Sequence, residues 1–221
     1  SGMAGSGTVI ASIPAGRAQD SAGNGNLAST SADNTVLYDN TGPTLTINQA
    51  AGQSDPTNAT TINFTVEFSE PVLGFTFADV TLGGTAGATT AVVTGSGTTY
   101  NVAVSGMVTD GTITAAIGAG VVTDATGNPN AAGTSTDNEV TFNTTSPTVT
   151  IQQAIGQSDP TGTSPINFMV TFSELVVGFT DSDMVIGGTA GANLAVISGA
   201  GPTYNVAVSG MTQDGIVSVS I

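Results

Sequence analysis

The chain has 221 residues, and only 8% of them are charged: 16 acidic side chains and one basic side chain, Arg17, give a net charge of −15. Nucleic acids and anionic membrane surfaces are bound through clustered Lys and Arg, so the charge argues against both as partners. There is no His, Cys or Lys. Nucleophiles activated by His, Schiff-base lysines and thiolate or imidazole metal sites are therefore excluded, and we expect no enzyme.

The apolar residues are distributed in a way that indicates a soluble β-protein. No run approaches the roughly 18 consecutive apolar residues of a membrane-spanning helix, so we expect no membrane insertion in this segment. Val and Ile alternate with Thr, Ser and Asn, which is typical of sheets with one face in water. The sequence also repeats itself without insertion or deletion: Ile47–Ala50 recurs as Ile151–Ala154, and Thr99–Val104 as Thr203–Val208, at a period of 104 residues.

A period of this length indicates complete folding units arranged in an array. We expect the last two strands of one repeat in residues 1–40, a complete repeat in residues 41–143, and a repeat that lacks its last strand in residues 144–221. Both ends fall inside the repeat. The chain is thus expected to be an excerpt of a longer polypeptide or, alternatively, a subunit with two split ends.

The complete repeat contains seven strand signals separated by turn residues. The clearest is Ile62–Phe68, in which apolar and polar residues alternate at the period of two that a half-buried strand requires. A turn is expected at residues 51–58, and glycines separate most of the later strands. In chain order, the predicted strands are residues 43–49, 62–68, 79–83, 89–94, 99–105, 111–117 and 138–143.

The apolar faces of these strands supply the predicted core. Because Cys and Trp are absent, packing has to come from aliphatic and Phe side chains. We expect Tyr100 and Tyr204 to be core tyrosines whose hydroxyl groups reach a backbone partner. The predicted core residues are Ile62, Phe64, Val66, Phe68, Val80, Leu82, Tyr100, Val102, Val104, Ile113, Ile117, Val140 and Phe142.

Seven short strands in about a hundred residues is the number of an immunoglobulin-like domain. Four runs carry a more specific likeness: Phe68–Val72, Gly74–Leu82, Val122–Asn128 and Asp137–Val140. In these runs the chain resembles the bacterial immunoglobulin-like repeats of large secreted and cell-surface proteins. The resemblance implies tandem immunoglobulin-like β-sandwiches that serve as a stalk, adhesin or fibre module outside the cell, and it implies no ligand.

We therefore expect a non-enzymatic structural spacer of a bacterial surface fibre or adhesin, with neighbouring repeats of the same or an adjacent chain as partners. One alternative is an adhesion module that binds carbohydrate or protein. Another is a filament subunit in which the segment near Asn34–Tyr38 completes the sandwich of the next chain, giving a head-to-tail homopolymer. The strands Gly7–Ile13 and Gly215–Ile221 would then compete for one position, which counts against this alternative.

Acidic residues are the remaining candidates for a binding site. Most form matched pairs across the period, such as Asp20 with Asp124, and most lie in turns. With one basic residue available, they are solvated, accept bonds from local amides or bind a cation. An immunoglobulin-like strand order would place Asp55 with Asp110 at one pole.

The same strand order would place Glu70, Asp124 and Asp137 at the opposite pole, beside the junction at residues 39–43. Oxygen ligands suit a hard cation, so we predict a Ca²⁺ site between repeats. The competing interpretation is an Asx-type turn at Asp124–Asn128, since no EF-hand spacing occurs. The candidate Ca²⁺ ligands are Asp55, Asp110, Glu70, Asp124, Asp137, Asp159, Glu174 and Asp183.

Overall fold

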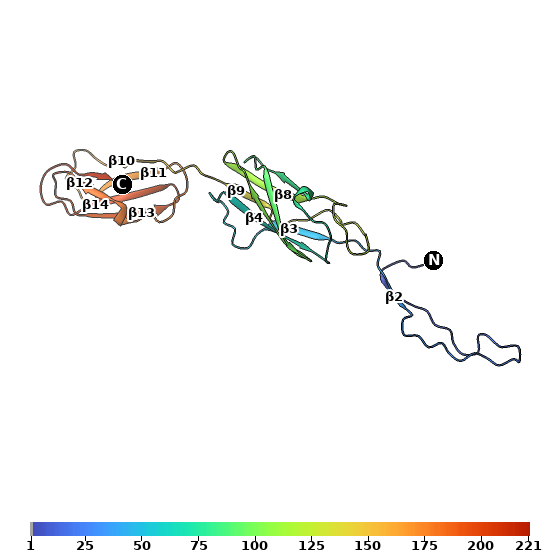
Figure 1. Cartoon of the computed structure of the whole chain (residues 1–221). Coiled ribbons are helices and arrows are strands. Elements are labelled where there is room, and N and C mark those ends of the chain that lie inside the picture. The colour runs from blue at the N-terminus through green and yellow to red at the C-terminus, as the bar shows by residue number, and fades with distance from the viewer. Residues whose placement is uncertain (1) are drawn as a thin grey trace. The chain divides into compact units, whose positions relative to one another are not determined.

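The computed structural model describes residues 2–221 (Figure 1). It is all-β, with no α-helix among these residues and two short 3₁₀ turns, η1 (Phe77–Asp79) and η2 (Asp181–Asp183). The chain divides into a first compact unit that extends to Thr144 and a second from Thr145 to Ile221. Both units are built from antiparallel sheets, consistent with β-sandwich domains. Within the described residues, no helix has the length and apolarity needed to span a bilayer.

The first unit begins with a separate hairpin of two strands, followed by a four-stranded and a three-stranded sheet. The hairpin consists of β1 (Gly7–Ile10) and β2 (Thr35–Tyr38). The four-stranded sheet has the order β3 (Leu45–Gln49), β4 (Thr61–Phe68), β7 (Thr99–Ser105) and β6 (Thr90–Ser96). The three-stranded sheet has the order β5 (Val80–Gly83), β8 (Gly111–Ile117) and β9 (Glu139–Phe142). All seven predicted strands of the complete repeat are thus confirmed.

Strand β4 shows how the sequence forms the core of the first unit. It pairs with β3 on one edge and β7 on the other, and its alternate residues Ile62, Phe64 and Val66 are fully buried. Most of the predicted core is confirmed, while Val80 and Leu82 on β5 are only partly buried. Strand β5 lies at the edge of its sheet, which explains this difference. Buried residues that the prediction left out of the core are Leu45, Ile47, Val72, Phe75, Ala86, Ala115 and Val122.

Three aromatic rings pack edge to face at one end of this core. The ring centroids of Phe75 and Tyr100 are 5.1 Å apart, and Phe68 lies 5.4 Å from Phe75 and 5.8 Å from Tyr100. Edge-to-face pairs contribute beyond the area that they bury. The arrangement recurs in the second unit in Phe172, Phe179 and Tyr204.

The second unit repeats these strands with one difference in its smaller sheet. Its four-stranded sheet has the order β10 (Val149–Gln153), β11 (Ile166–Phe172), β14 (Thr203–Ser209) and β13 (Leu194–Ala200). The other sheet contains β12 (Val185–Gly187) and β15 (Ser218–Ser220) and has two strands instead of three. The Tyr204 hydroxyl donates a hydrogen bond of 3.4 Å to the carbonyl oxygen of Val176, as predicted for this tyrosine.

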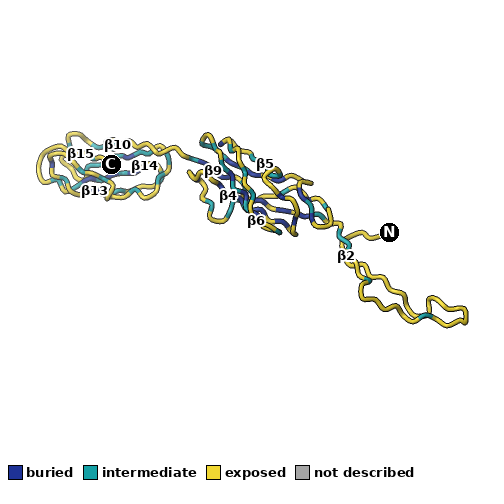
Figure 2. Tube along the Cα trace, in the orientation of Figure 1, coloured by how far each residue is buried: buried dark blue, intermediate teal, exposed yellow. Residues whose placement is uncertain are grey.

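The β1–β2 hairpin belongs to the repeat but lies outside any core. Its register, with Gly7 opposite Tyr38, is that of β8 and β9, where Gly111 lies opposite Phe142. Figure 2 shows it exposed almost throughout, in contrast to the buried strands of the complete repeat. The hairpin thus has the register of β8 and β9 although none of its strand residues is buried.

We predict that Phe64→Ala destabilises the first unit by about 3–5 kcal/mol, since it opens a cavity at a fully buried position. Phe77→Ala is the matched control, because that ring is 67% exposed and its loss should stay within about 0.5 kcal/mol. Denaturant unfolding followed by tyrosine fluorescence measures both. Equal effects of the two substitutions would contradict the described core.

Candidate functional site

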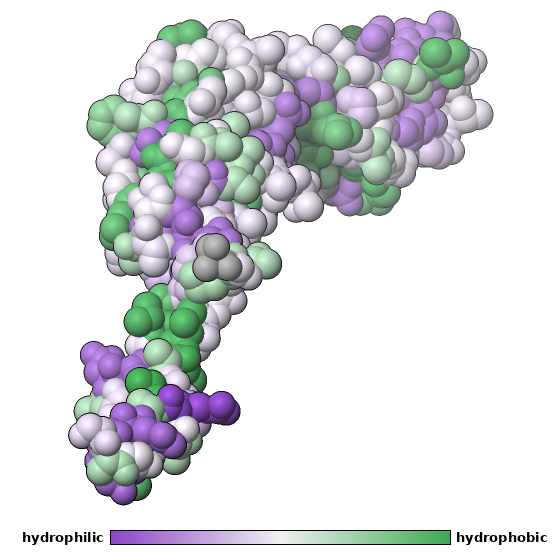
Figure 3. Space-filling model, turned by 90° about the vertical axis from the view of Figure 1, so that its right-hand side faces the viewer, coloured by the Kyte–Doolittle hydropathy of each residue, from purple (hydrophilic) through white to green (hydrophobic). Residues whose placement is uncertain are grey.

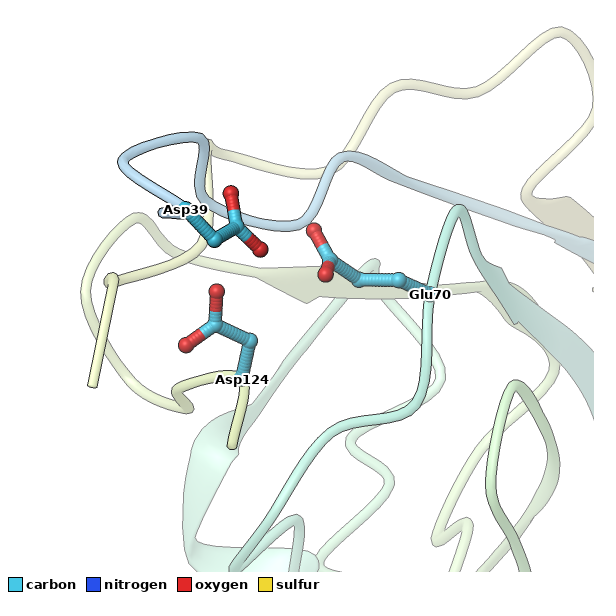
Figure 4. Close-up of side chains that lie close together, drawn as sticks. All are labelled: Asp39, Glu70 and Asp124. Carbon is cyan, nitrogen blue, oxygen red and sulfur yellow. The ribbon is translucent and has the colours of Figure 1, made fainter. Parts of the chain in front are cut away.

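Three carboxylates from separate segments meet at one end of the complete repeat (Figure 4). Asp39 follows β2, Glu70 follows β4, and Asp124 lies in the loop between β8 and β9. One oxygen atom from each lies within 4.8 Å of the others, and this is the one such acidic group within residues 2–221. Asp124 is buried and the other two are half-buried. The predicted proximity of Glu70 and Asp124 to the junction is thus present in the structure.

The loop around Asp124 is held by its own carboxylate. Asp124 Oδ1 accepts hydrogen bonds from the amides of Thr126 (2.8 Å) and Asn128 (2.9 Å), while Oδ2 accepts one from Asn128 Nδ2 (2.8 Å). This is the predicted Asx-type turn. Asp20 makes the equivalent bonds to Asn24 in the preceding partial repeat, so the turn forms without neighbouring carboxylates.

Asp39 is fixed by the junction that leads into the complete repeat. Its Oδ1 accepts hydrogen bonds from Ser6 Oγ (2.7 Å) and the Thr41 amide (3.1 Å). Its carbonyl oxygen accepts a bond of 3.3 Å from Asn128 Nδ2, the amide group that also binds Asp124. A Cβ atom on Gly42 would overlap the Pro129 carbonyl oxygen, so only glycine allows the junction to pass this close to the loop.

The electrostatics of the three carboxylates are unequal. Burial and then the charges of Asp124 and Asp39 raise the pKa of Glu70. Burial also acts to raise the pKa of Asp124, but hydrogen bonds from Asn128 and Thr126 outweigh it and lower the pKa to about 2. Glu70 therefore experiences the mutual repulsion, because Asp124 is held in its ionised form.

Asp137 does not join this group, which corrects the prediction that it shares a pole with Glu70 and Asp124. Its amide donates to Asn48 Oδ1 (3.1 Å), and its carbonyl oxygen accepts a bond from the Gln49 amide (2.6 Å). The segment before β9 runs parallel to β3, starting at the bridge between Thr46 and Thr134. It thereby carries Asp137 to the end of β3 away from the junction.

Asp55 and Asp110 both accept hydrogen bonds from the chain around the end of β9. Asp55 Oδ1 accepts a hydrogen bond from the Thr141 amide (2.9 Å), and Asp110 Oδ1 accepts one from the Thr144 amide (2.8 Å). Acceptance of backbone donors accounts for both side chains. They belong to no group of three acidic residues in the described part of the chain.

The second unit contains three of the predicted ligands. Within the described residues 2–221 they belong to no group of three acidic side chains: Asp159, Glu174 and Asp183. Asp183 Oδ2 caps η2 by accepting bonds from the Thr180 amide (2.7 Å) and hydroxyl (3.0 Å). Asn143 stands one period after Asp39 and cannot supply the same carboxylate. The arrangement at the first junction is therefore not reproduced at the second.

Asp39 is the member of the group that the candidate ligands omitted. The predicted ligands are acids that recur one period away in the sequence, whereas Asn143 stands at that distance from Asp39. The sequence signal that pointed to Asp39 was its place in the junction beside the predicted pole.

A comparison with protein-family models gave no match to this chain, and a search of curated proteins gave none either.

Three carboxylates without nitrogen or sulfur donors form a set that suits a hard cation, and Ca²⁺ accepts six to eight oxygens at variable geometry. Asp39, Glu70 and Asp124 are the residues that would hold it, with carbonyl oxygens and water as further ligands. A bound cation would offset the repulsion that raises the pKa of Glu70. These three residues form a smaller ligand set than the one expected from the sequence. Glu70 and Asp124 belong to both sets.

We predict that Glu70→Gln raises the unfolding midpoint of the first unit near neutral pH in the presence of a chelator. A raised pKa means that the fold favours protonated Glu70. The stability due to this group is therefore full below the pKa of the unfolded chain and is lost as the pH rises through the folded-state pKa. The gain should vanish in acid, and Glu67→Gln, exposed on β4, should not show it. Melting temperatures as a function of pH provide the test.

Ca²⁺ should raise the melting temperature of the first unit, by the equivalent of about 2.7 kcal/mol when the free ion exceeds Kd about a hundredfold. Glu70→Gln should reduce this response because it removes a charged ligand, whereas Glu67→Gln should retain it. Thermal melts with Ca²⁺ and with chelator measure both. Identical midpoints for the wild-type chain would remove the cation from the site.

Proposed function

We propose that this chain is a non-enzymatic structural module of an extracellular bacterial fibre or adhesin, built from tandem immunoglobulin-like β-sandwiches. The observation that carries the proposal is the repetition of one strand pairing along the chain. The pairs Ile62–Val104 and Phe64–Val102 of the first unit recur as Ile166–Val208 and Phe168–Val206 in the second. Units that repeat in this way extend a chain by constant steps.

The junction into the complete repeat supports a role in setting distance. Pro43 is fully buried, and its carbonyl oxygen accepts a hydrogen bond from the Ala131 amide (2.8 Å). Pro also fixes its own φ angle, and the neighbouring Gly42 passes close to the loop between β8 and β9. These contacts fix the entry of the chain against the complete repeat, which supports a defined spacing between modules.

The alternative of a carbohydrate- or protein-binding adhesion module has less support. Sugar sites are commonly lined by aromatic rings, whereas Trp is absent and the rings of Phe68, Phe75 and Tyr100 pack against one another in the core. Extracellular location fits the missing Cys and Lys but follows from the resemblance and not from composition. We therefore favour the spacer role over the adhesion module for this chain.

Addition of further 104-residue copies after the complete repeat should lengthen the particle by equal increments, because each copy folds as its own unit. Electron microscopy of chains with increasing copy number measures the increment. The matched control scrambles the order of the residues in the added segment at constant composition. Lengths that do not increase in step with copy number would contradict the spacer role.

A further inference from the structure

Three segments of this chain have the pattern Asn-x-Ser/Thr, in which an enzyme can attach a sugar to the Asn side chain. All three Asn residues lie in the first unit, and the structure presents them differently. A chain rich in Asn and Thr contains such patterns by chance, so the pattern alone identifies no site. The three segments are Asn58-Ala59-Thr60, Asn63-Phe64-Thr65 and Asn143-Thr144-Thr145.

The second of these segments is closed to an enzyme by the sheet. Asn63 lies on β4, between β3 and β7, and its Oδ1 atom accepts a hydrogen bond of 3.0 Å from Asn101 Nδ2. Phe64, at the middle position of the pattern, is fully buried. A transferase has to hold the backbone of the pattern in its own active site. Access to Asn63 would therefore require β4 to leave the core.

The third segment is held in place where the chain leaves β9. Asn143 is half-buried, and its backbone amide donates a hydrogen bond of 2.9 Å to the Thr57 carbonyl oxygen. Asp110 Oδ1 accepts bonds from both the amide (2.8 Å) and the hydroxyl (2.7 Å) of Thr144, the middle residue of the pattern. An enzyme could bind this segment only after these bonds had been broken.

The first segment is presented on the surface. Asn58, Ala59 and Thr60 are all exposed and lie in the loop between β3 and β4. The preceding residue, Thr57, is buried and anchors this loop. Its amide donates to the Thr141 carbonyl oxygen (2.9 Å), and its Oγ1 accepts a bond from the Ala59 amide (3.1 Å). The loop therefore has a fixed base and an accessible tip, on which functional residues are commonly carried.

A hollow in the surface beside Asn58 has room for the first sugar residue. Its volume is about 350 Å³, and its lining consists of Ser54, Pro56, Thr57, Asn58 and Asn143. Sugar hydroxyl groups both donate and accept hydrogen bonds, and Ser and Asn side chains can do the same. The loop thus combines an attachment point with a neighbouring surface that suits a neutral, polar group.

The composition of the surface is consistent with a role for attached carbohydrate. On the face drawn in Figure 3, much of the surface has a hydropathy near the middle of the scale, between scattered hydrophilic and hydrophobic groups. Residues 41–143 contain no basic side chain, so more acidic residues there would only add repulsion. Attached carbohydrate is bulky and increases solubility. A neutral sugar hydrates this repeat without adding to the net charge of −15.

We propose that Asn58 is an N-glycosylation site of the folded chain. In the transfer, Asn58 Nδ2 forms a bond to C1 of the sugar and loses a proton to a base of the transferase. The bond between C1 and the phosphate oxygen of a glycosyl diphosphate donor breaks, and the diphosphate leaves with the electron pair. Gly162 stands one period after Asn58, so the equivalent loop of the second unit has no such site. The inference goes beyond the proposed spacer role and does not depend on it.

Glycosyl transfer to the folded 221-residue chain tests the site, with UDP-glucose as donor and a transferase that modifies synthetic peptides of all three segments. We expect one added hexose on the folded chain, located at Asn58 by mass spectrometry of its peptides. Asn58→Gln and Thr60→Ala should each abolish the addition, the second because the pattern loses its hydroxyl. The matched control is Thr61→Ala, which removes an exposed hydroxyl just outside the pattern and should keep full modification.

A folded chain that stays unmodified while the Asn58 peptide is modified would overturn the proposal. Equal modification of Asn58, Asn63 and Asn143 on the folded chain would also contradict it, because the fold would then not select the site. The chain isolated from the cells that produce it should carry carbohydrate at Asn58, and a bare side chain there rejects the proposal. The spacer role is measured separately, by the length added for each repeat, so the two proposals can fail independently.

Discussion

The ladder between β8 and β9 is the interaction on which the complete repeat depends. It adds Val140 and Phe142 to the core that contains Ile62, Phe64 and Val66 of β4. The second unit has the same first sheet and lacks this ladder, and Phe168 remains half-buried there. The two units share the register of β4 with β7 and of β11 with β14, so the burial of these strands depends on pairing that is distant in sequence.

The same ladder positions the acidic group. Its connecting loop contains Asp124, whose carboxylate shapes the turn, and Asn128 of that turn bonds both Asp124 and the carbonyl oxygen of Asp39. A residue used for local folding is thereby placed against two acids from other segments. The unfavourable electrostatic interaction acts on Glu70, whose pKa is raised by burial and by the charges of Asp124 and Asp39. Local turn chemistry therefore determines where charge accumulates at the junction.

Much of the fold could be predicted from the sequence because strand signals are local. Alternation in β4 and the glycines between strands predicted the elements, and Asp124 at the start of a polar run predicted the Asx-type turn. The second amide bond, from Asn128, is visible only in the structure. The candidate site was harder, since Asp39 approaches it through a junction whose path depends on Gly42. The predicted position of Asp137 was wrong because the segment before β9 pairs with β3, a contact between residues distant in sequence.

Charge and open strand edges have opposing effects on this chain. An unpaired edge such as that of β10 favours pairing with any other strand, which is the usual route to aggregation. A net charge of −15 with one basic residue makes every nonspecific encounter between copies repulsive. The acidic composition therefore limits nonspecific pairing between exposed strand edges of different copies.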